Sequence, residues 1–315
     1  MGRAVTAGGA LLVVGDVVTD VVVRHRGPLA TGTDTSAAVR LLPGGAGANV
    51  ACWAVHSGCR EVRLLGRVGA ESAGWHERAL IASGVRPHLV VDPGAPTGTV
   101  VCLVDSSAAA ERTFLTDSGA SLRLEAGDWS DPLLDGVDRL HLSGYLLFSG
   151  TGRALVARAV TAARARGVPV SLDPASAGFL VTLGVDRFLA LVEGVDLLLP
   201  SRDEACLLTG LPDPADAAAE LSRHVPLVVM KQGAAGARVA WTGAVRAHVP
   251  AVPAIARDTT GAGDAFTGAF LAALLTGATP ETAAARGCGA GALAVARVGA
   301  RPPRARCSSE VFRAL

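Results

Sequence analysis

The feature that most constrains the fold is a regular alternation of short apolar runs and helix-like segments between residues 140 and 230. The apolar runs have the length and composition of buried strands: Leu140–Leu142, Val170–Leu172, Leu197–Leu199 and Leu227–Met230. Segments of helical composition lie between them, at Ala154–Arg166, Phe188–Val192 and Ala215–Arg223. Strands that alternate with helices predict a parallel sheet with helices on both faces. The predicted fold class is therefore α/β, with a doubly wound and mostly parallel sheet.

Four strand-like segments nearer the N-terminus break this alternation. Val17–Val23 and Thr31–Leu42 follow the first buried strand, Ala10–Val14, with no helix between them. Thr99–Val104 and Arg112–Thr116 flank a polar stretch, which is typical of a hairpin. We predict that these segments form a small β accessory, built by insertions into the larger domain.

Composition and motifs exclude several classes of function. Charged residues make up 18% of the chain and the formal net charge is +1, so neither nucleic acid nor an anionic membrane is an expected partner. Lys231 is the only lysine and the string G-x-x-x-x-G-K-[ST] is absent, which excludes a lysine-bearing P-loop. Gly15 is followed by Asp16-Val17, so the chain also lacks the Gly-x-Gly-x-x-Gly fingerprint of dinucleotide-binding dehydrogenases.

The cysteines and apolar segments predict the compartment. The six cysteines form no C-x-x-C pair, and the seven histidines show no metal-ligand spacing. We expect reduced thiols and no dedicated zinc site. No apolar segment is both long and uninterrupted enough for a signal peptide or a membrane span. The sequence therefore predicts a soluble, cytoplasmic protein.

The most informative string is Asp258-Thr259-Thr260-Gly261-Ala262-Gly263-Asp264, which precedes an alanine-rich helix over Ala265–Leu275. The backbone amides of Gly261, Ala262 and Gly263 would point out of the helix N-terminus and form a cradle for an anion. Asp264 has two interpretations. It is either a helix-start carboxylate stabilised by the dipole, or a general base that takes the proton of an attacking hydroxyl.

A second glycine-rich string, Pro43-Gly44-Gly45-Ala46-Gly47-Ala48-Asn49, opens another predicted helix. Close glycines let a ligand approach the backbone, and Asn49 offers a donor and an acceptor to a polyhydroxylated ligand. The alternative is a plain strand–turn–helix connection with a capping Asn. Asp16 and Asp20 follow the carboxyl end of a buried strand, where open α/β sheets bind ligands. They are either acceptors for paired sugar hydroxyls or solvated loop charges.

Together these strings resemble the ribokinase-like PfkB family of carbohydrate kinases. The resemblance covers nearly the whole chain: the Gly-Asp after the first strand, the Gly-Gly-x-Gly-x-Asn string, and the highly specific Asp-Thr-x-Gly-Ala-Gly-Asp string. It implies a single kinase domain over residues 1–315, with a β-sheet lid formed by insertions at about 17–43 and 98–117. It also implies ATP and Mg²⁺ as cofactors, and a homodimer that pairs through the lids.

The resemblance implies a role for each matching residue. Asp264 would be the base, and Gly261, Ala262 and Gly263 the anion hole. The acceptor would be bound by Asp16, Asp20, Gly44, Gly45 and Asn49. The nucleotide would be bound by Ser201, Glu204, Lys231, Gly233 and Gly236, with Glu204 reaching Mg²⁺ through water. Asp258 and Gly299 lie where many members bind a monovalent cation such as K⁺. The alternatives are a solvated surface lysine for Lys231 and an ordinary turn at Gly299.

Three positions depart from the family pattern. Ser201 replaces the Asn of an Asn-x-x-Glu motif that ends here in Glu204, which questions metal handling. Ala46 stands where ribokinases often carry a lysine. Ala175, after Asp173-Pro174, stands where many sugar kinases place Asn. The last two changes leave the acceptor open.

The expected activity is transfer of the γ-phosphate of ATP to a hydroxyl of a sugar or sugar-like molecule. Two alternatives stay open: a nucleoside kinase of the same family, and a non-catalytic sugar or nucleotide sensor, which Ser201 suggests. Arg112 would meet a carboxylate of the acceptor or face solvent, and Phe114 would stack on a base.

Overall fold

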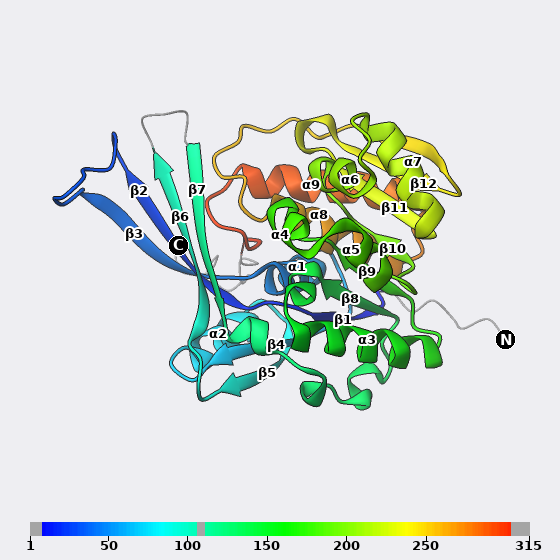
Figure 1. Ribbon diagram of the computed structural model, residues 1–315, viewed down its shortest axis with the longest axis horizontal. Helices are drawn as coiled ribbons and strands as arrows, with labels where there is room; N and C mark the ends of the chain where they lie inside the picture. The colour runs from blue at the N-terminus through cyan, green and yellow to red at the C-terminus, as the bar shows by residue number, and fades with distance from the viewer. Residues whose placement is uncertain (1–7, 106–110, 304–315) are drawn as a thin grey trace, which may run out of the picture.

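A nine-stranded sheet forms the centre of the computed structural model, which describes residues 8–105 and 111–303 (Figure 1). Its strand order is β13-β12-β11-β10-β9-β8-β1-β4-β5. Seven strands run parallel: β1 (Ala10–Val14), β4 (Glu61–Gly69), β5 (Arg86–Asp92), β8 (Arg139–Ser143), β9 (Val170–Asp173), β10 (Leu197–Leu198) and β11 (Leu227–Lys231). At one edge, β12 (Ala237–Trp241) and β13 (Ala244–Val249) pair antiparallel. The predicted α/β class with a mostly parallel sheet is confirmed.

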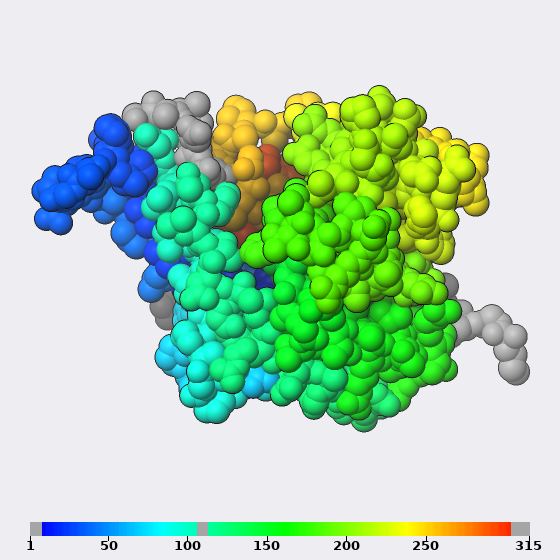
Figure 2. Space-filling model, in the orientation of Figure 1, coloured from blue at the N-terminus to red at the C-terminus, as the bar shows by residue number. Residues whose placement is uncertain are grey.

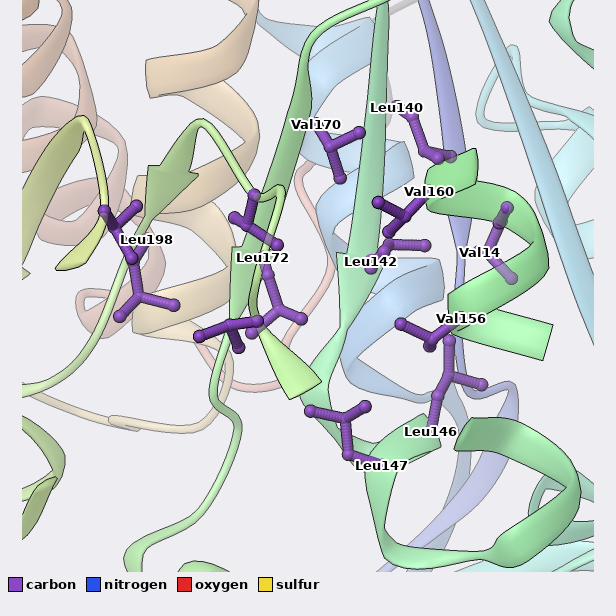
Figure 3. Close-up of a cluster of buried hydrophobic side chains, with 14 of the residues drawn as sticks. Val14, Leu140, Leu142, Leu146, Leu147, Val156, Val160, Val170, Leu172 and Leu198 are labelled. Atoms are coloured by element: carbon purple, nitrogen blue, oxygen red, sulfur yellow. The ribbon is translucent and has the colours of Figure 1, made fainter. Parts of the chain in front are cut away.

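Helices cover both faces of this sheet because the residues of each strand point alternately to opposite sides. Leu11 and Val13 of β1 join a buried cluster with α1 (Ala46–His56), α2 (Ala73–Ile81), α8 (Ala262–Leu275) and α9 (Pro280–Val295). Leu12 and Val14 join the opposite cluster, part of which Figure 3 shows. That cluster includes side chains of α3 (Gly150–Ala165), α4 (Ala177–Leu183), α5 (Val185–Leu191), α6 (Arg202–Thr209) and α7 (Pro214–His224).

A separate four-stranded sheet projects from one side of the molecule (Figure 1). Its order is β3-β2-β6-β7, from β2 (Val18–His25), β3 (Ala37–Gly44), β6 (Thr97–Asp105) and β7 (Glu111–Gly119). β2 pairs parallel with β6, and the other two pairs are antiparallel. The strands therefore come from the two segments predicted to form the β accessory.

Some predicted boundaries were wrong. β3 begins at Ala37 and not at Thr31, because residues 31–36 are glycine and short polar residues that bond the backbone locally. The hydroxyl of Thr35, for example, accepts a hydrogen bond from the amide of Ala30 at 2.8 Å. The helix predicted at 188–192 is α5, which begins at Val185 and ends at Leu191.

Two further observations concern chemistry and location. Among the described residues, Cys52, Cys59, Cys206 and Cys288 are free thiols, while Cys307 lies outside the described residues. Among residues 8–105 and 111–303, no helix has the length and apolar character needed to cross a bilayer.

Candidate active site

A cavity of about 690 Å³ lies where the small sheet meets the carboxyl ends of the central strands. Figure 2 shows the surface hollowed between the small sheet, in blue and cyan, and the green and yellow part of the large domain. Eleven of the sixteen predicted site residues border this cavity: Asp16, Asp20, Gly45, Asn49, Ser201, Glu204, Lys231, Gly233, Gly261, Gly263 and Asp264. Gly44, Gly236, Asp258, Ala262 and Gly299 lie outside its lining.

The N-terminus of α8 opens into the cavity at a glycine turn. Gly261 caps the helix with a left-handed φ of 73°. A Cβ at this position would lie 2.5 Å from the Cβ of Ala300, so both the conformation and the space require glycine. The amides of Gly261 and Gly263 make no hydrogen bond within the described part of the chain, whereas the amide of Ala262 donates to the carbonyl of Thr259 at 3.3 Å.

Asp264 in the first turn of α8 is bonded to a residue from the other glycine string. Asn49 Nδ2 donates to Asp264 Oδ2 at 2.8 Å, which joins two segments far apart in the sequence. Burial raises the pKa of Asp264 to about 7, although the bond from Asn49 opposes this shift. Asn49 is only 4% exposed, and its Oδ1 is buried without a partner in the structure. An acceptor hydroxyl bound beside Asp264 could supply the donor that this oxygen lacks.

Asp16 holds the turn that begins α1. Its carboxylate accepts from the amides of Ala46 at 2.6 Å and Gly47 at 3.2 Å, and from Ser143 Oγ at 2.9 Å. Gly45, the N-cap of α1, has a φ of 100°, and a Cβ there would lie 2.4 Å from the carbonyl oxygen of Asp16. The carboxylate of Asp16 is therefore engaged in shaping the glycine turn.

Asp20 differs from Asp16 because its carboxylate is not bonded. It lies on β2 at the cavity wall, and no hydrogen bond or ion pair to it forms among residues 8–105 and 111–303. The carboxylate packs against Gly44, where a Cβ would lie 2.3 Å from Asp20 Cγ. Burial raises the pKa of Asp20 to about 7, and the positive charge of Arg301 opposes that shift.

Lys231 forms a largely buried ion pair at the end of β11, with both side chains 14% exposed. Its ammonium group bonds Asp173 Oδ2 in a very short contact, and Thr267 Oγ1 donates to the same oxygen at 2.9 Å. Burial lowers the pKa of Lys231, but the charges of Asp173 and Glu204 outweigh it and raise the pKa overall. Burial, followed by the charge of Asp173, raises the pKa of Glu204.

Ser201 and Glu204 form a capping box at the start of α6. The amide of Glu204 donates to Ser201 Oγ at 3.3 Å, and the amide of Ser201 donates to Glu204 Oε2 at 2.7 Å. Serine in place of asparagine therefore keeps Glu204 fixed at the cavity wall. The Ser-x-x-Glu pattern could have predicted this box from the sequence.

The remaining predicted residues lie in two places: Gly233 and Gly236 in the connection from β11 to β12, and Asp258 and Gly299 near the start of α8. Gly233 borders the cavity, while Gly236 closes the β11–β12 connection, where a Cβ would lie 2.0 Å from the carbonyl oxygen of Val249. Asp258 Oδ1 accepts from the amide of Thr260 at 2.9 Å, and Asp258 Oδ2 accepts from the amide of Gly299 at 3.0 Å. The structure thus brings Asp258 and Gly299 together near the N-terminus of α8.

An aromatic group at the cavity wall was not predicted. The rings of Phe148 and Phe179 stack with centroids 4.9 Å apart, and Tyr145 meets both edge-on. Tyr145 and Phe179 border the cavity, as does the half-exposed Phe114 of β7. The side chain of Arg112 lies outside the described residues. Tyr145 and Phe148 are close in the sequence, but nothing in it indicates their contact with the distant Phe179.

A doubly wound α/β sheet, a glycine-capped helix N-terminus and a partly buried carboxylate beside it define the chain as a ribokinase-like phosphotransferase. The sequence profile of "pfkB family carbohydrate kinase" matches residues 10–306. The chain therefore belongs to the PfkB family of carbohydrate kinases, whose members use ATP with Mg²⁺.

Relatives in sequence and structure agree with this assignment. The chain is 32% identical to a fructokinase from Klebsiella pneumoniae over 302 residues, covering 90% of this chain and 92% of the relative. It is 31% identical to a 2-dehydro-3-deoxygluconokinase from Thermoproteus tenax over 279 residues, covering 86% of this chain and 85% of the relative. The structure is similar to a putative ribokinase II from E. coli solved with ATP and Mg²⁺, at 26% identity with a TM-score of 0.80 over 93% of this chain and 94% of that one.

Proposed function

We propose that the chain transfers the γ-phosphate of ATP to a hydroxyl of a neutral sugar, with Asp264 as the general base. The observation that supports this most is the bond between Asn49 and Asp264. It brings a hydroxyl-binding amide next to a carboxylate that stands at the glycine cradle of α8. The acceptor hydroxyl, the carboxylate of Asp264 and the γ-phosphate of ATP would then lie next to one another.

In the proposed reaction, Asp264 accepts the proton of the acceptor hydroxyl as that oxygen attacks the γ-phosphorus. The bond between the γ-phosphorus and the β,γ-bridging oxygen breaks, and ADP leaves with the electron pair. A pKa of about 7 suits Asp264 to take a proton near neutral pH. The amides of Gly261 and Gly263, which have no partner among the described residues, would hold the charge that develops on the transferred group.

The cation sites belong to the same proposal. Mg²⁺ bound to ATP neutralises charge on its phosphate oxygens. Within the described chain no group of three or more His, Cys, Asp or Glu side chains forms a ready metal site, so phosphate and water would supply most ligands. Glu204 would hold such a hydrated ion through water. Both oxygens of Asp258 accept amide protons, which holds this carboxylate beside the Gly299 turn, and we propose K⁺ binding where these two segments meet. Faster turnover in K⁺ than in Na⁺ would support this part.

The charge around the cavity favours a neutral acceptor. Among the described residues, its wall carries the carboxylates Asp16, Asp20, Asp173, Glu204 and Asp264, against one ammonium group, that of Lys231. An acidic sugar would be repelled by this excess of negative charge. The similarity to a fructokinase supports a neutral sugar as well.

A nucleoside is the second candidate acceptor, because an aromatic group borders the cavity. Tyr145 and Phe179 form this wall and Phe148 supports it from behind. Aromatic side chains stack on nucleobases, and they also pack against the apolar faces of sugars. The screen described next separates the two.

The test is an ADP-release assay with a panel of neutral sugars, sugar acids, sugar phosphates and nucleosides. We expect release that depends on a neutral sugar. The Asp264→Asn variant should lose about 10²–10⁴-fold in kcat while the acceptor KM changes little. Asp216→Asn is the matched control, since Asp216 is also a first-turn aspartate but is exposed on α7. Normal turnover by Asp264→Asn would refute the assigned base.

We also propose that the small sheet acts as a lid and as a dimer surface. The face of this sheet that holds Asp20 and Val100 borders the cavity. The opposite face carries Val39, Leu41 and Leu115, each more than half exposed. Covering these side chains would bury apolar surface. Leu41→Glu should shift the mass measured by light scattering from dimer to monomer, whereas Val181→Glu, at an exposed valine on α4, should not.

A further inference from the structure

Arg301 carries a buried guanidinium group that has no bonded partner among residues 8–105 and 111–303. All three of its side-chain nitrogens, Nε, Nη1 and Nη2, are buried, and none makes a hydrogen bond in the structure. A guanidinium group remains charged under all ordinary conditions, so an unpaired one inside a protein is costly unless an opposite charge lies near. The position of Arg301 therefore calls for a functional explanation.

The backbone that carries Arg301 is firmly attached to the catalytic turn. Trp53 Nε1 of α1 donates to the carbonyl of Ala300 at 2.8 Å. Ala300 packs against Gly261, and the amide of the preceding Gly299 is bonded to Asp258. The start of the Arg301 side chain is thus fixed relative to the anion cradle of α8.

The groups that feel the charge of Arg301 come from three elements around the acceptor end. They are Asp20 of β2, Cys52 of α1 and His76 of α2. Burial raises the pKa of the Cys52 thiol, and burial lowers the pKa of His76 to about 4, so both are neutral near pH 7. His76 Nε2 is moreover bonded to Thr19 Oγ1 at 3.1 Å. Geometry agrees with this, since a Cβ at Gly299, two residues before Arg301, would lie 3.4 Å from Leu42 Cδ1, and Leu42 stands opposite Asp20 in the pairing of β2 with β3. Among the described neighbours named here, Asp20 is therefore the group that can carry a negative charge.

The cavity reaches Asp20 but not the guanidinium group. Asp20 borders the cavity and Arg301 does not. A ligand in the cavity would therefore contact the carboxylate, with the positive charge of Arg301 lying beyond it. Direct binding of an anionic acceptor by Arg301 does not fit this arrangement.

We propose that Arg301 is a positioning residue for the acceptor, which acts by holding the Asp20 carboxylate charged and available to the acceptor's hydroxyls. This inference rests on the proposed role of Asp20 in acceptor binding. A charged carboxylate accepts stronger hydrogen bonds than a neutral acid and donates none. Arg301 supplies the charge that favours this form in a buried setting.

The test is a comparison of Michaelis constants for Arg301→Met with the acceptor found in the screen. We expect the acceptor KM to rise about 10- to 100-fold, as for loss of a charge-assisted bond. The ATP KM and kcat should stay within about threefold, since the catalytic end is unchanged. Arg301→Lys keeps the charge and should restore most of the acceptor affinity. Arg297→Met, at an exposed arginine of the same segment, is the control and should have no effect.

A double-mutant comparison with Asp20→Asn shows whether the effect passes through Asp20. After Asp20→Asn, Arg301→Met should raise the acceptor KM by less than about twofold. Independent effects of the two changes would overturn the inference. The inference would also be overturned if Arg301→Met raised the acceptor KM and the ATP KM equally and lowered Tm, and if Arg301→Lys gave no rescue. That outcome would indicate a purely structural arginine.

The two proposals fail in different ways. If Asp20→Asn leaves the acceptor KM unchanged, the proposed acceptor site is wrong and the role of Arg301 fails with it. If Asp20→Asn raises that KM and Arg301→Met does not, only the inference about Arg301 is overturned.

Discussion

The two ends of the cavity differ in how their charges are satisfied. At the catalytic end, Asp264 is bonded to Asn49, and Asp173 is bonded to both Lys231 and Thr267. At the end formed by the small sheet, Asp20 and Arg301 lie near one another with no bonded partner among the described residues. The first arrangement is pre-organised before any ligand binds, whereas the second leaves hydrogen-bonding capacity for the acceptor. The difference indicates that the binding energy of the acceptor is used to orient groups at the end formed by the small sheet.

The largest effect is expected from breaking the ion pair at the catalytic end. Lys231→Met leaves Asp173 buried without its counter-charge, and should lower the free energy of unfolding by about 3–5 kcal/mol. The double variant Lys231→Met/Asp173→Asn removes both charges and should recover most of that loss. Urea unfolding measures both. Equal stability of the single and double variants would mean that the ion pair between Lys231 and Asp173 does not stabilise the catalytic end of the cavity.

A second prediction concerns pH and Asp264. The folded pKa of about 7 lies above the ordinary value of 3.8, so the folded state keeps a proton that the unfolded chain releases as pH rises through this window. Wild-type stability should therefore fall between about pH 4 and pH 7, relative to Asp264→Asn. At pH 8 we expect this variant to be more stable by on the order of 2–4 kcal/mol, with no advantage at pH 4. Unfolding curves at both pH values check the sign.

Asn49→Ala tests the link between the two glycine strings. It removes the bond that favours ionised Asp264, so kcat/KM should fall about 10- to 100-fold. In the wild type kcat/KM should rise with pH to a plateau above about 7, because the base must be ionised. The midpoint should move to higher pH in the variant. An unchanged midpoint would mean that Asn49 does not tune Asp264.

The smallest effect is expected at Ala175, which borders the cavity just after Asp173 and Pro174. Its φ of 82° is unfavourable for alanine, whereas glycine or asparagine adopts it readily. Ala175→Gly should stabilise the protein by up to about 1 kcal/mol, since relief of strain outweighs the greater entropy of the unfolded chain. A clear loss of stability would contradict this. Thermal unfolding beside the wild type is sufficient to measure it.

Local patterns predicted much of the fold. Alternation predicted the parallel strands from β8 to β11, because each buried strand is a short apolar run with polar residues around it. The antiparallel pair β12 and β13 was missed, although Thr242-Gly243 between them is a two-residue hairpin turn in which both residues have positive φ. The α9 helix was missed as well.

The candidate site was predictable only where chemistry is encoded in contiguous strings. The strings around Gly44 and Gly261 pointed to Asn49 and Asp264, and the structure brings these two residues into contact. The partners contributed by isolated residues could not be predicted, since nothing near Thr267, Phe179 or Arg301 in the sequence indicates which distant group it approaches. The assigned roles in acceptor and nucleotide binding stay predictions until the variants are measured.

The solitary lysine of this chain has a practical consequence. Reagents that modify primary amines have one side-chain target, Lys231, besides the chain's terminal amine. That target is shielded by Asp173 at the wall of the cavity. The extent of lysine acylation, followed by mass spectrometry, would thus report on opening and ligand occupancy of the cavity without any engineered label.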